Sequence, residues 1–204
     1  MIAPRLPRAQ PRVLHSVCVY CGARTGDDPR FAAAARRLAD LLAAHGVRLV
    51  YGASSIGLMG VLAEQMIAQG GAVTGIIPRH LDTAEVTNRA VQELVLVNSM
   101  HERKKLMFDR SDAFVILPGG FGTLDELVEV VTWAQLGLHD KPIILVNQHD
   151  YWRPLLDLIG HLIDKGFAAP ETGRLIRVVD DVDDAIAAAL ETGGGARTAF
   201  SELF

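Results

Sequence analysis

The stretch Ala113–Pro142, AFVILPGGFGTLDELVEVVTWAQLGLHDKP, organises the interpretation of the whole chain. It opens with an apolar run that ends at Pro118, continues through Gly119, Gly120 and Gly122, and then shows apolar residues at helical spacing. This pattern predicts a buried strand, a tight loop and a helix. Glycines let the backbone approach a ligand closely, and the amides that open a helix favour an anion. We therefore predict a phosphate-binding loop.

Capping offers a second interpretation of the same segment. Thr123 and Glu126 are three residues apart, the spacing of a capping box with Thr123 as the N-cap. Capping explains these two residues without a ligand but does not explain the three glycines before them. From spacing alone, Glu126 is equally a cap and a catalyst, and both interpretations stay open.

Apolar runs and amphipathic segments alternate along the rest of the chain. Strands are predicted at 13–20, 47–51, 72–77, 94–97, 113–117, 142–147 and 176–179, and helices at 31–45, 58–69, 100–110, 124–136, 151–165 and 182–191. The alternation predicts an α/β fold, a single Rossmann-like doubly wound domain (13–191) with a mostly parallel sheet flanked by helices. Residues 1–12 are expected to be a disordered leader, 192–204 a loose tail, and 79–89 a loop or short helix that reaches over a site.

Three loops are expected at the carboxyl ends of the strands: 21–25, 52–57 and 118–123. Doubly wound sheets bind their ligands at this edge, where the strand order reverses, so the loops should line one crevice. GASSIG and GGFG do not match the dinucleotide fingerprint GxGxxG, and no acidic residue ends the second strand. The sequence therefore favours a mononucleotide over NAD.

Composition excludes several classes of function. The 204 residues carry a formal net charge of −4, which gives no basic field for nucleic acid. No signal peptide and no run long enough to span a bilayer are recognised, so we expect a cytoplasmic protein without a membrane partner. Cys18 and Cys21 form a CxxC without a second cysteine pair and lie in or beside an apolar strand, which favours packing over redox or zinc chemistry. No metal and no cofactor are expected.

The chain resembles the LONELY GUY family, the cytokinin riboside 5'-monophosphate phosphoribohydrolases. The resemblance rests on PGGFGTLDE with TWAQLGLHDKP, on Met100-His101-Glu102-Arg103-Lys104-Lys105, and on VCVYCGA, YGASSIGLMG and GIIPRHL. It implies hydrolysis of N6-modified AMP to the free base and ribose 5-phosphate. It also implies a homodimer whose active sites are completed across the interface.

Cleavage of an N-glycosidic bond develops positive charge on the sugar ring and requires a water on the opposite face. A carboxylate can stabilise that charge and position or deprotonate the water. Glu126 is our candidate, and its place near a helix N-terminus is expected to keep its pKa low. Arg103 carries a guanidinium suited to a phosphate and to orienting work. The resemblance assigns Arg103 and Glu126 to the catalytic pair, and the group that protonates the leaving base is not identified.

The resemblance and the predicted loops together give a set of substrate-binding residues. The set comprises Gly22, Ser54, Gly57, Glu85, Lys104, Gly119, Gly120, Phe121, Gly122, Thr123, Leu124, Asp125 and Thr132. Without the resemblance, Glu85 is an ordinary surface carboxylate, Thr132 is equally a core-lining threonine, and Arg103–Lys105 is a solvated basic helix face. Ala53 departs from the family, whose members commonly have Gly-Gly at 52–53. A positive φ there would cost roughly 1 kcal/mol.

Two further functions compete with the leading hypothesis. The same reaction on AMP itself would make the protein a purine nucleotide nucleosidase, and a few apolar contacts around N6 decide between these substrates. A non-catalytic carrier of nucleotides or of the molybdenum cofactor is the alternative from another class, and the joint presence of Arg103 and Glu126 argues against it. Lysine decarboxylase is a further label given to such sequences. It is rejected because this sequence shows no recognisable pyridoxal phosphate site.

Overall fold

The computed structural model describes residues 13–190, so the predicted leader (1–12) and tail (192–204) lie outside the described residues. The strands are β1 (Ser16–Tyr20), β2 (Arg48–Tyr51), β3 (Val73–Pro78), β4 (Glu93–Val97), β5 (Ala113–Ile116), β6 (Ile143–Val146) and β7 (Ile176–Val179). The α-helices are α1 (Pro29–Ala44), α2 (Gly57–Ala68), α3 (Met100–Asp109), α4 (Phe121–Gln135), α5 (Arg153–Asp164) and α6 (Ala185–Leu190). Short 3₁₀ turns are η1 (Arg79–Leu81), η2 (Gln148–Asp150), η3 (Pro170–Leu175) and η4 (Val182–Asp184).

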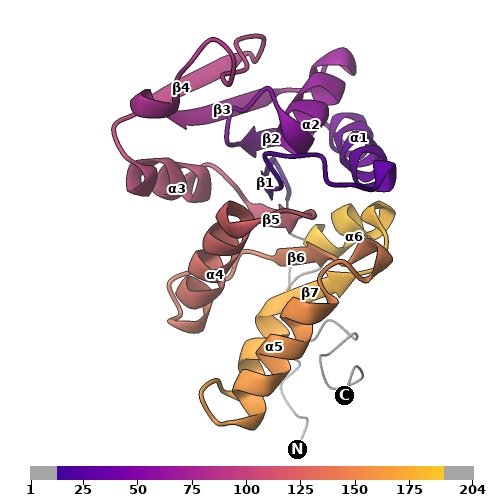
Figure 1. The fold of residues 1–204 in the computed structure, drawn as a ribbon, viewed down its shortest axis with the longest axis vertical. Coiled ribbons are helices and arrows are strands. Elements are labelled where there is room, and N and C mark those ends of the chain that lie inside the picture. The colour runs from indigo at the N-terminus through magenta and orange to yellow at the C-terminus, as the bar shows by residue number, and fades with distance from the viewer. Residues whose placement is uncertain (1–12, 191–204) are drawn as a thin grey trace, which may run out of the picture.

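The strands form one parallel sheet in the order β4-β3-β2-β1-β5-β6-β7. The chain starts in the middle with β1, moves outward to β4, and returns to place β5 on the other side of β1 (Figure 1). The order of strands therefore reverses between β1 and β5, which makes this the topological switch point. The prediction of a doubly wound α/β fold is confirmed.

Each central strand contributes to two hydrophobic cores, because neighbouring residues point to opposite faces of the sheet. Val17 and Val19 of β1 pack into a core with α1, α2 and α6, whereas Cys18 and Tyr20 pack into a second core with α3, α4 and α5. Helices cover both faces, as Figure 1 shows. Burial on both faces explains why these strands are continuous apolar runs.

Four predicted helix starts differ from the structure by two or three residues, those of α1 (Pro29, not 31), α4, α5 and α6 (Ala185, not 182). Helix α4 begins at Phe121 with Gly120 as N-cap and has no side-chain cap, so Thr123 and Glu126 do not form a capping box. Helix α5 begins at Arg153 rather than at 151, with Trp152 (φ −89, ψ 3) as its N-cap, and the preceding His149 and Asp150 both have a left-handed φ of 57.

The segment 79–89 contains η1 and then packs against the loop after β2. Ser55 N donates to Val86 O at 2.7 Å, and Asn88 N donates to Ala53 O at 2.8 Å. Ser54 and Thr87 form an isolated antiparallel bridge. These bonds hold the segment on the second loop.

The two cysteines are free and buried, one in each core, which confirms the packing interpretation. Burial raises the pKa of both thiols and keeps them protonated. No group of three or more His, Cys, Asp or Glu side chains that could hold a metal occurs within 13–190. Over the same range, no helix is long and apolar enough to cross a membrane.

Candidate active site

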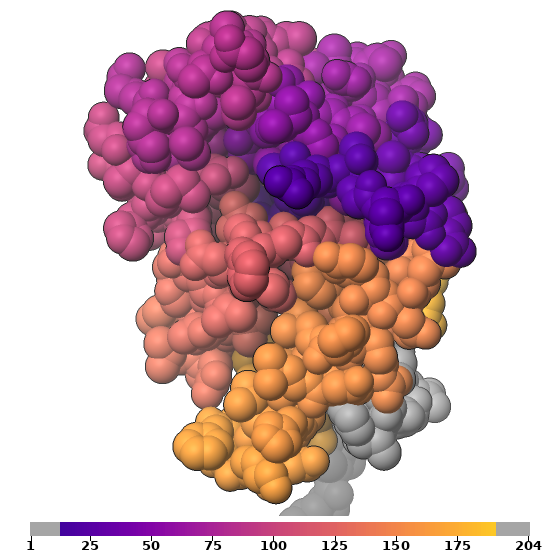
Figure 2. Space-filling view, viewed as in Figure 1, coloured from indigo at the N-terminus to yellow at the C-terminus, as the bar shows by residue number. Residues whose placement is uncertain are grey.

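A cleft of about 660 Å³ opens at the switch point, at the carboxyl ends of β1 and β5. Its volume lies within the range of small-molecule sites. In Figure 2, the indigo segment after β1, the start of α4 and the orange segment before α5 meet on the face toward the viewer. The lining residues come from these segments and from α1, α2 and α3: Cys21–Asp27, Phe31, Leu58, Met59, Arg103, Pro118–Thr123, Glu126 and Tyr151.

The glycine loop and the loop after β1 are bonded directly to each other. Gly22 N donates to Pro118 O at 3.0 Å, while Gly22 O accepts from Leu58 N at 3.0 Å, so Gly22 joins both loops to the start of α2. A Cβ at position 119 would overlap the side chain of Thr123, which turns back over the loop. Only glycine at 119 therefore permits this close approach.

Arg103 reaches the cleft from the first turn of α3. This helix has a side-chain cap: Glu102 N donates to Ser99 Oγ at 3.1 Å, and Glu102 Oε2 accepts from Asn98 N at 2.7 Å. A Cβ at position 52 would overlap the Arg103 guanidinium, so Gly52 provides the space into which that group extends.

The Arg103 side chain is only 11% exposed, and its Nε is buried without a hydrogen-bond partner in the described part of the chain. A buried donor without a partner costs roughly 1 to 3 kcal/mol. The guanidinium that carries this unpaired donor lies in the wall of the cleft, where a ligand would meet it.

Glu126 lies beside Arg103, with Oε1 3.7 Å from Arg103 Nη2 and only 10% of its side chain exposed. Burial raises the pKa of Glu126 to about 7, against the opposing effect of Arg103. The expected low pKa is therefore wrong. Since α4 begins at Phe121, Glu126 is in the second turn of the helix, beyond the first turn where the dipole acts most strongly. Desolvation of the carboxylate dominates instead.

Lys104 points away from the cleft and is not among its lining residues. The buried ammonium is 3.0 Å from Asp125 Oδ2 and 3.2 Å from Glu129 Oε1, so it ties α3 to α4. Its predicted contact with the nucleotide finds no support in this geometry. The ion pairs instead connect the two helices that carry Arg103 and Glu126.

Of the predicted substrate-binding residues, the cleft brings together Gly22, Gly119, Gly120, Phe121, Gly122 and Thr123, along with the catalytic candidates Arg103 and Glu126. Gly57 lines an adjoining hollow with Arg24. The buried Ser54 hydroxyl accepts from Ile56 N at 3.2 Å, and Glu85 is exposed in the segment over the second loop.

Leu124, Asp125 and Thr132 lie on α4 outside the cleft lining. Thr132 is exposed rather than core-lining, and its hydroxyl donates to Val128 O at 2.7 Å. For these three residues to contact the substrate as predicted, a second copy of the chain would have to contribute to the site.

Two aromatic residues of the cleft, Phe31 and Tyr151, carry no sequence signal of a role in the site. Both were assigned only to predicted helices, and the two rings meet edge to face at 5.4 Å. Their apolar composition matches core positions, so only the folded structure brings them to the site. Ala53 does adopt a positive φ of 58, the angle that the family's glycine would accommodate.

Comparison with known proteins finds relatives over most of the chain. A family model described as "Possible lysine decarboxylase" matches residues 59–189. The cytokinin riboside 5'-monophosphate phosphoribohydrolase of Rhodococcoides fascians is 43% identical over 174 residues, which cover 85% of this chain and 88% of the relative. The Arabidopsis thaliana enzyme of that name, LOG1, is 44% identical over 160 residues, covering 78% and 75%.

Solved structures extend the comparison of the fold. The molybdenum cofactor carrier protein of Chlamydomonas reinhardtii superposes with a TM-score of 0.64 at 24% identity, over 85% of this chain and 94% of that one. At this identity the likeness concerns the fold alone.

Proposed function

The chain belongs to the family of the cytokinin riboside 5'-monophosphate phosphoribohydrolases, and from this membership we propose that it hydrolyses the N-glycosidic bond of N6-modified AMP. Water and the nucleotide give the free base and ribose 5-phosphate. The observation that carries the proposal is the buried pair of Arg103 and Glu126, 3.7 Å apart, at the glycine loop of a nucleotide-sized cleft.

The glycine loop and Arg103 suit the 5'-phosphate and the sugar. The amides at the start of α4 favour an anion, and a guanidinium supplies directed donors to phosphate or hydroxyl oxygens. Arg103 lines the cleft with a side chain that is 11% exposed, so part of its guanidinium can meet a ligand there. Binding the phosphate in this way would hold the anomeric carbon in the cleft near Glu126.

Glu126 supports the chemical step in two ways. As a carboxylate it stabilises the positive charge that develops on the ribose when the bond from C1' to the base breaks. With a pKa of about 7, it is also matched to accepting a proton from the attacking water at neutral pH. The water oxygen then bonds to C1', and the base leaves with the electron pair of the broken bond and takes up a proton.

The lysines of the chain do not support the decarboxylase description of the family model. The sequence has four lysines, Lys104, Lys105, Lys141 and Lys165, and none lines the cleft. Lys104 and Lys105 are ion-paired with carboxylates, and Lys141 lies over the Phe108 ring while donating to Phe108 O. A pyridoxal phosphate enzyme needs a lysine at the cofactor.

A homodimer formed through the outer face of α4 is the second part of the proposal. Phe121 is 92% exposed and Val128 is 56% exposed on this helix. A covering second copy would remove these apolar side chains from water. It would also bring Leu124, Asp125 and Thr132 into a shared site, as their predicted roles require. The cytoplasmic location stays a prediction.

The test is chromatography of the purified protein after incubation with N6-isopentenyl-AMP and with AMP in parallel. We expect release of free base, with kcat/KM higher for the modified nucleotide. Equal or greater efficiency on AMP would assign the chain to purine nucleotide hydrolysis. Binding of both nucleotides without base release would refute the hydrolase and favour a carrier.

A further inference from the structure

Tyr151 makes a hydrogen bond across the cleft to the glycine loop. Its hydroxyl donates to Gly119 O at 2.6 Å, between residues 32 positions apart in the sequence. The ring is held edge to face by Phe31 at 5.4 Å and by Trp152 at 4.8 Å, and it lines the cleft. The phenol therefore reaches the proposed phosphate loop from a separate part of the chain.

The bond acts on a peptide group with two glycine neighbours. In a trans peptide the C=O and the next N–H point in opposite directions, and the described residues contain no cis peptide. Holding Gly119 O therefore fixes the direction of Gly120 N–H. Because both flanking residues are glycines, this peptide would otherwise rotate with little steric resistance. In the reversed orientation, the carbonyl oxygen rather than the N–H would face the anion.

Gly120 is the N-cap of α4, and its N–H donates to no acceptor within residues 13–190. An ordered N–H at a helix start is an anion ligand. Tyr151 thus holds the carbonyl half of a peptide whose amide half is available to a phosphate.

The segment that carries Tyr151 is fixed in an unfavourable backbone conformation. His149 and Asp150 both have φ 57, the left-handed region that residues other than glycine rarely adopt. Buried Asn147 stabilises it: Asn147 Nδ2 donates to Asp150 Oδ1 at 3.1 Å, and Trp152 N donates to Asn147 Oδ1 at 2.8 Å.

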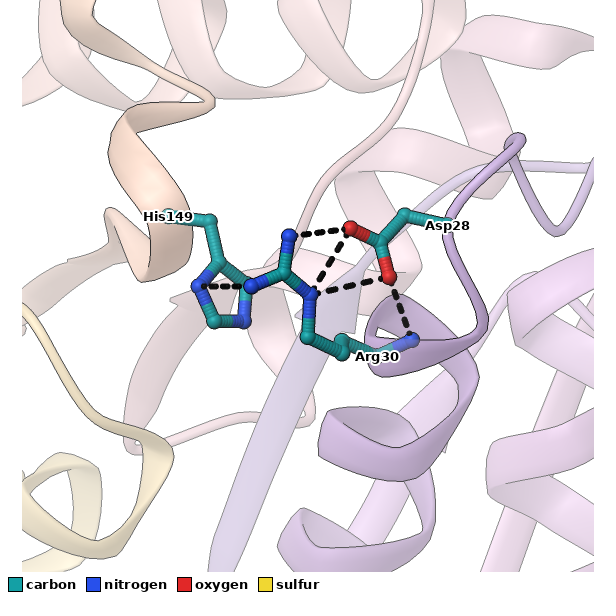
Figure 3. A network of polar contacts seen from close by, with 3 residues as sticks. All are labelled: Asp28, Arg30 and His149. Atoms are coloured by element: carbon teal, nitrogen blue, oxygen red, sulfur yellow. Dashed lines mark hydrogen bonds and ion pairs between the residues drawn. The ribbon is translucent and has the colours of Figure 1, made fainter.

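A second anchor comes from the start of α1 and its N-cap, Asp28. Figure 3 shows the Arg30 guanidinium between the Asp28 carboxylate and the His149 ring. Arg30 Nη1 is 3.1 Å from His149 Nδ1, and Arg30 Nε donates to Asp28 Oδ2 at 2.8 Å. Contacts from two sides thus hold this strained segment where its phenol meets Gly119.

We propose that Tyr151 is a positioning residue for phosphate recognition: its hydroxyl holds the Gly119 carbonyl so that Gly120 N–H is directed at the 5'-phosphate of the nucleotide. The inference rests on the proposed function for its ligand. It assigns no chemistry to Tyr151, which acts through the backbone of the glycine loop.

The test compares Tyr151→Phe with Tyr51→Phe and the wild type. Tyr151→Phe removes the hydroxyl and keeps the ring contacts, while Tyr51 is buried and does not line the cleft. Affinity for AMP and for adenosine is measured by calorimetry. We expect Tyr151→Phe to weaken AMP binding about threefold to tenfold, the equivalent of one hydrogen bond, and to leave adenosine binding unchanged. In turnover, KM should rise with kcat nearly constant.

Other outcomes would overturn the inference. Equal weakening of AMP and adenosine would make Tyr151 a general structural residue, and unchanged AMP affinity would show that the hydroxyl does not order the loop. If AMP binding weakens as expected but no variant and no wild type releases base, the hydrolase fails and the positioning role stands. If the wild type does not bind AMP, both fail.

Discussion

At the scale of single residues, Glu126 shows how far local sequence determines chemistry. The PGGFGTLDE segment identified the residue and its neighbourhood, but the predicted low pKa required a helix that starts directly after Thr123 as N-cap. The helix begins earlier, and packing leaves only 10% of the Glu126 side chain exposed, so desolvation outweighs the dipole. Burial of this kind arises from residues distant in sequence, such as Arg103, and no local pattern reveals it.

The raised pKa of Glu126 predicts the pH dependence of catalysis. If the ionised carboxyl is the active form, kcat/KM rises with pH and levels off above about 7. The substrate phosphate also titrates near pH 6. Glu126→Gln retains that second effect, so its residual activity serves as the reference. A wild-type profile that parallels the Glu126→Gln profile between pH 5.5 and 8 would show that Glu126 does not titrate there.

The same shift predicts a pH dependence of stability. The pKa of Glu126 is raised from 4.5 in the reference state to about 7 in the fold, so its stabilising contribution is complete below about pH 4.5 and is lost as the pH rises through 7. At about 1.4 kcal/mol per pKa unit, the change is about 3 kcal/mol at most. Urea unfolding at pH 5 and pH 8 should show the wild type losing stability relative to Glu126→Gln. A constant difference between the two proteins would contradict the shift.

At the scale of elements, strands and long helices were predictable because each carries its own signal. Buried parallel strands such as β5 and β6 are continuous apolar runs, and α1 repeats apolar residues at helical spacing. The errors fall at helix starts, where backbone geometry decides which residue opens the helix. His149 and Asp150 adopt positive φ without being glycines, which composition does not signal.

Gly57 offers a test of how closely the loops at the switch point approach each other. It has φ +66, and an added Cβ would overlap the backbone of Ala23. Gly70 has a similar φ of +71 with no atom within 4 Å of such a Cβ. Gly70→Ala should therefore cost about 1 kcal/mol, from backbone strain alone. Gly57→Ala should cost clearly more in urea unfolding and should also weaken AMP binding. Equal costs for the two variants would refute the close approach.

At the scale of the whole molecule, the site combines residues from positions 21 to 151 at one edge of the sheet. Sequence reasoning located this edge, because parallel strands and their order imply a switch point. It identified the glycine loop, Arg103 and Glu126 through motifs. It did not find Phe31 or Tyr151, whose relation to the cleft exists only in the folded chain.

The proposed dimer predicts the effect of a charge on α4. Val128→Glu places a carboxylate on the exposed apolar face and should give a monomer in light scattering, with KM raised if sites are shared. Ala33→Glu, at an exposed position on α1 across the sheet, is the matched control and should leave assembly unchanged. A wild type that is monomeric at micromolar concentration would exclude the shared site.

The most direct test of the proposed hydrolase follows the phosphorus and the base together. ³¹P NMR and chromatography are applied to N6-isopentenyl-AMP with wild type, Arg103→Gln, Glu126→Gln and the exposed control Arg36→Gln. We predict ribose 5-phosphate and free base in equal amounts, no inorganic phosphate, and a loss in kcat/KM of about 10²-fold or more in the two site variants but not in the control. Undiminished activity in Arg103→Gln and Glu126→Gln, or release of inorganic phosphate in place of base, would contradict the assignment of this pair.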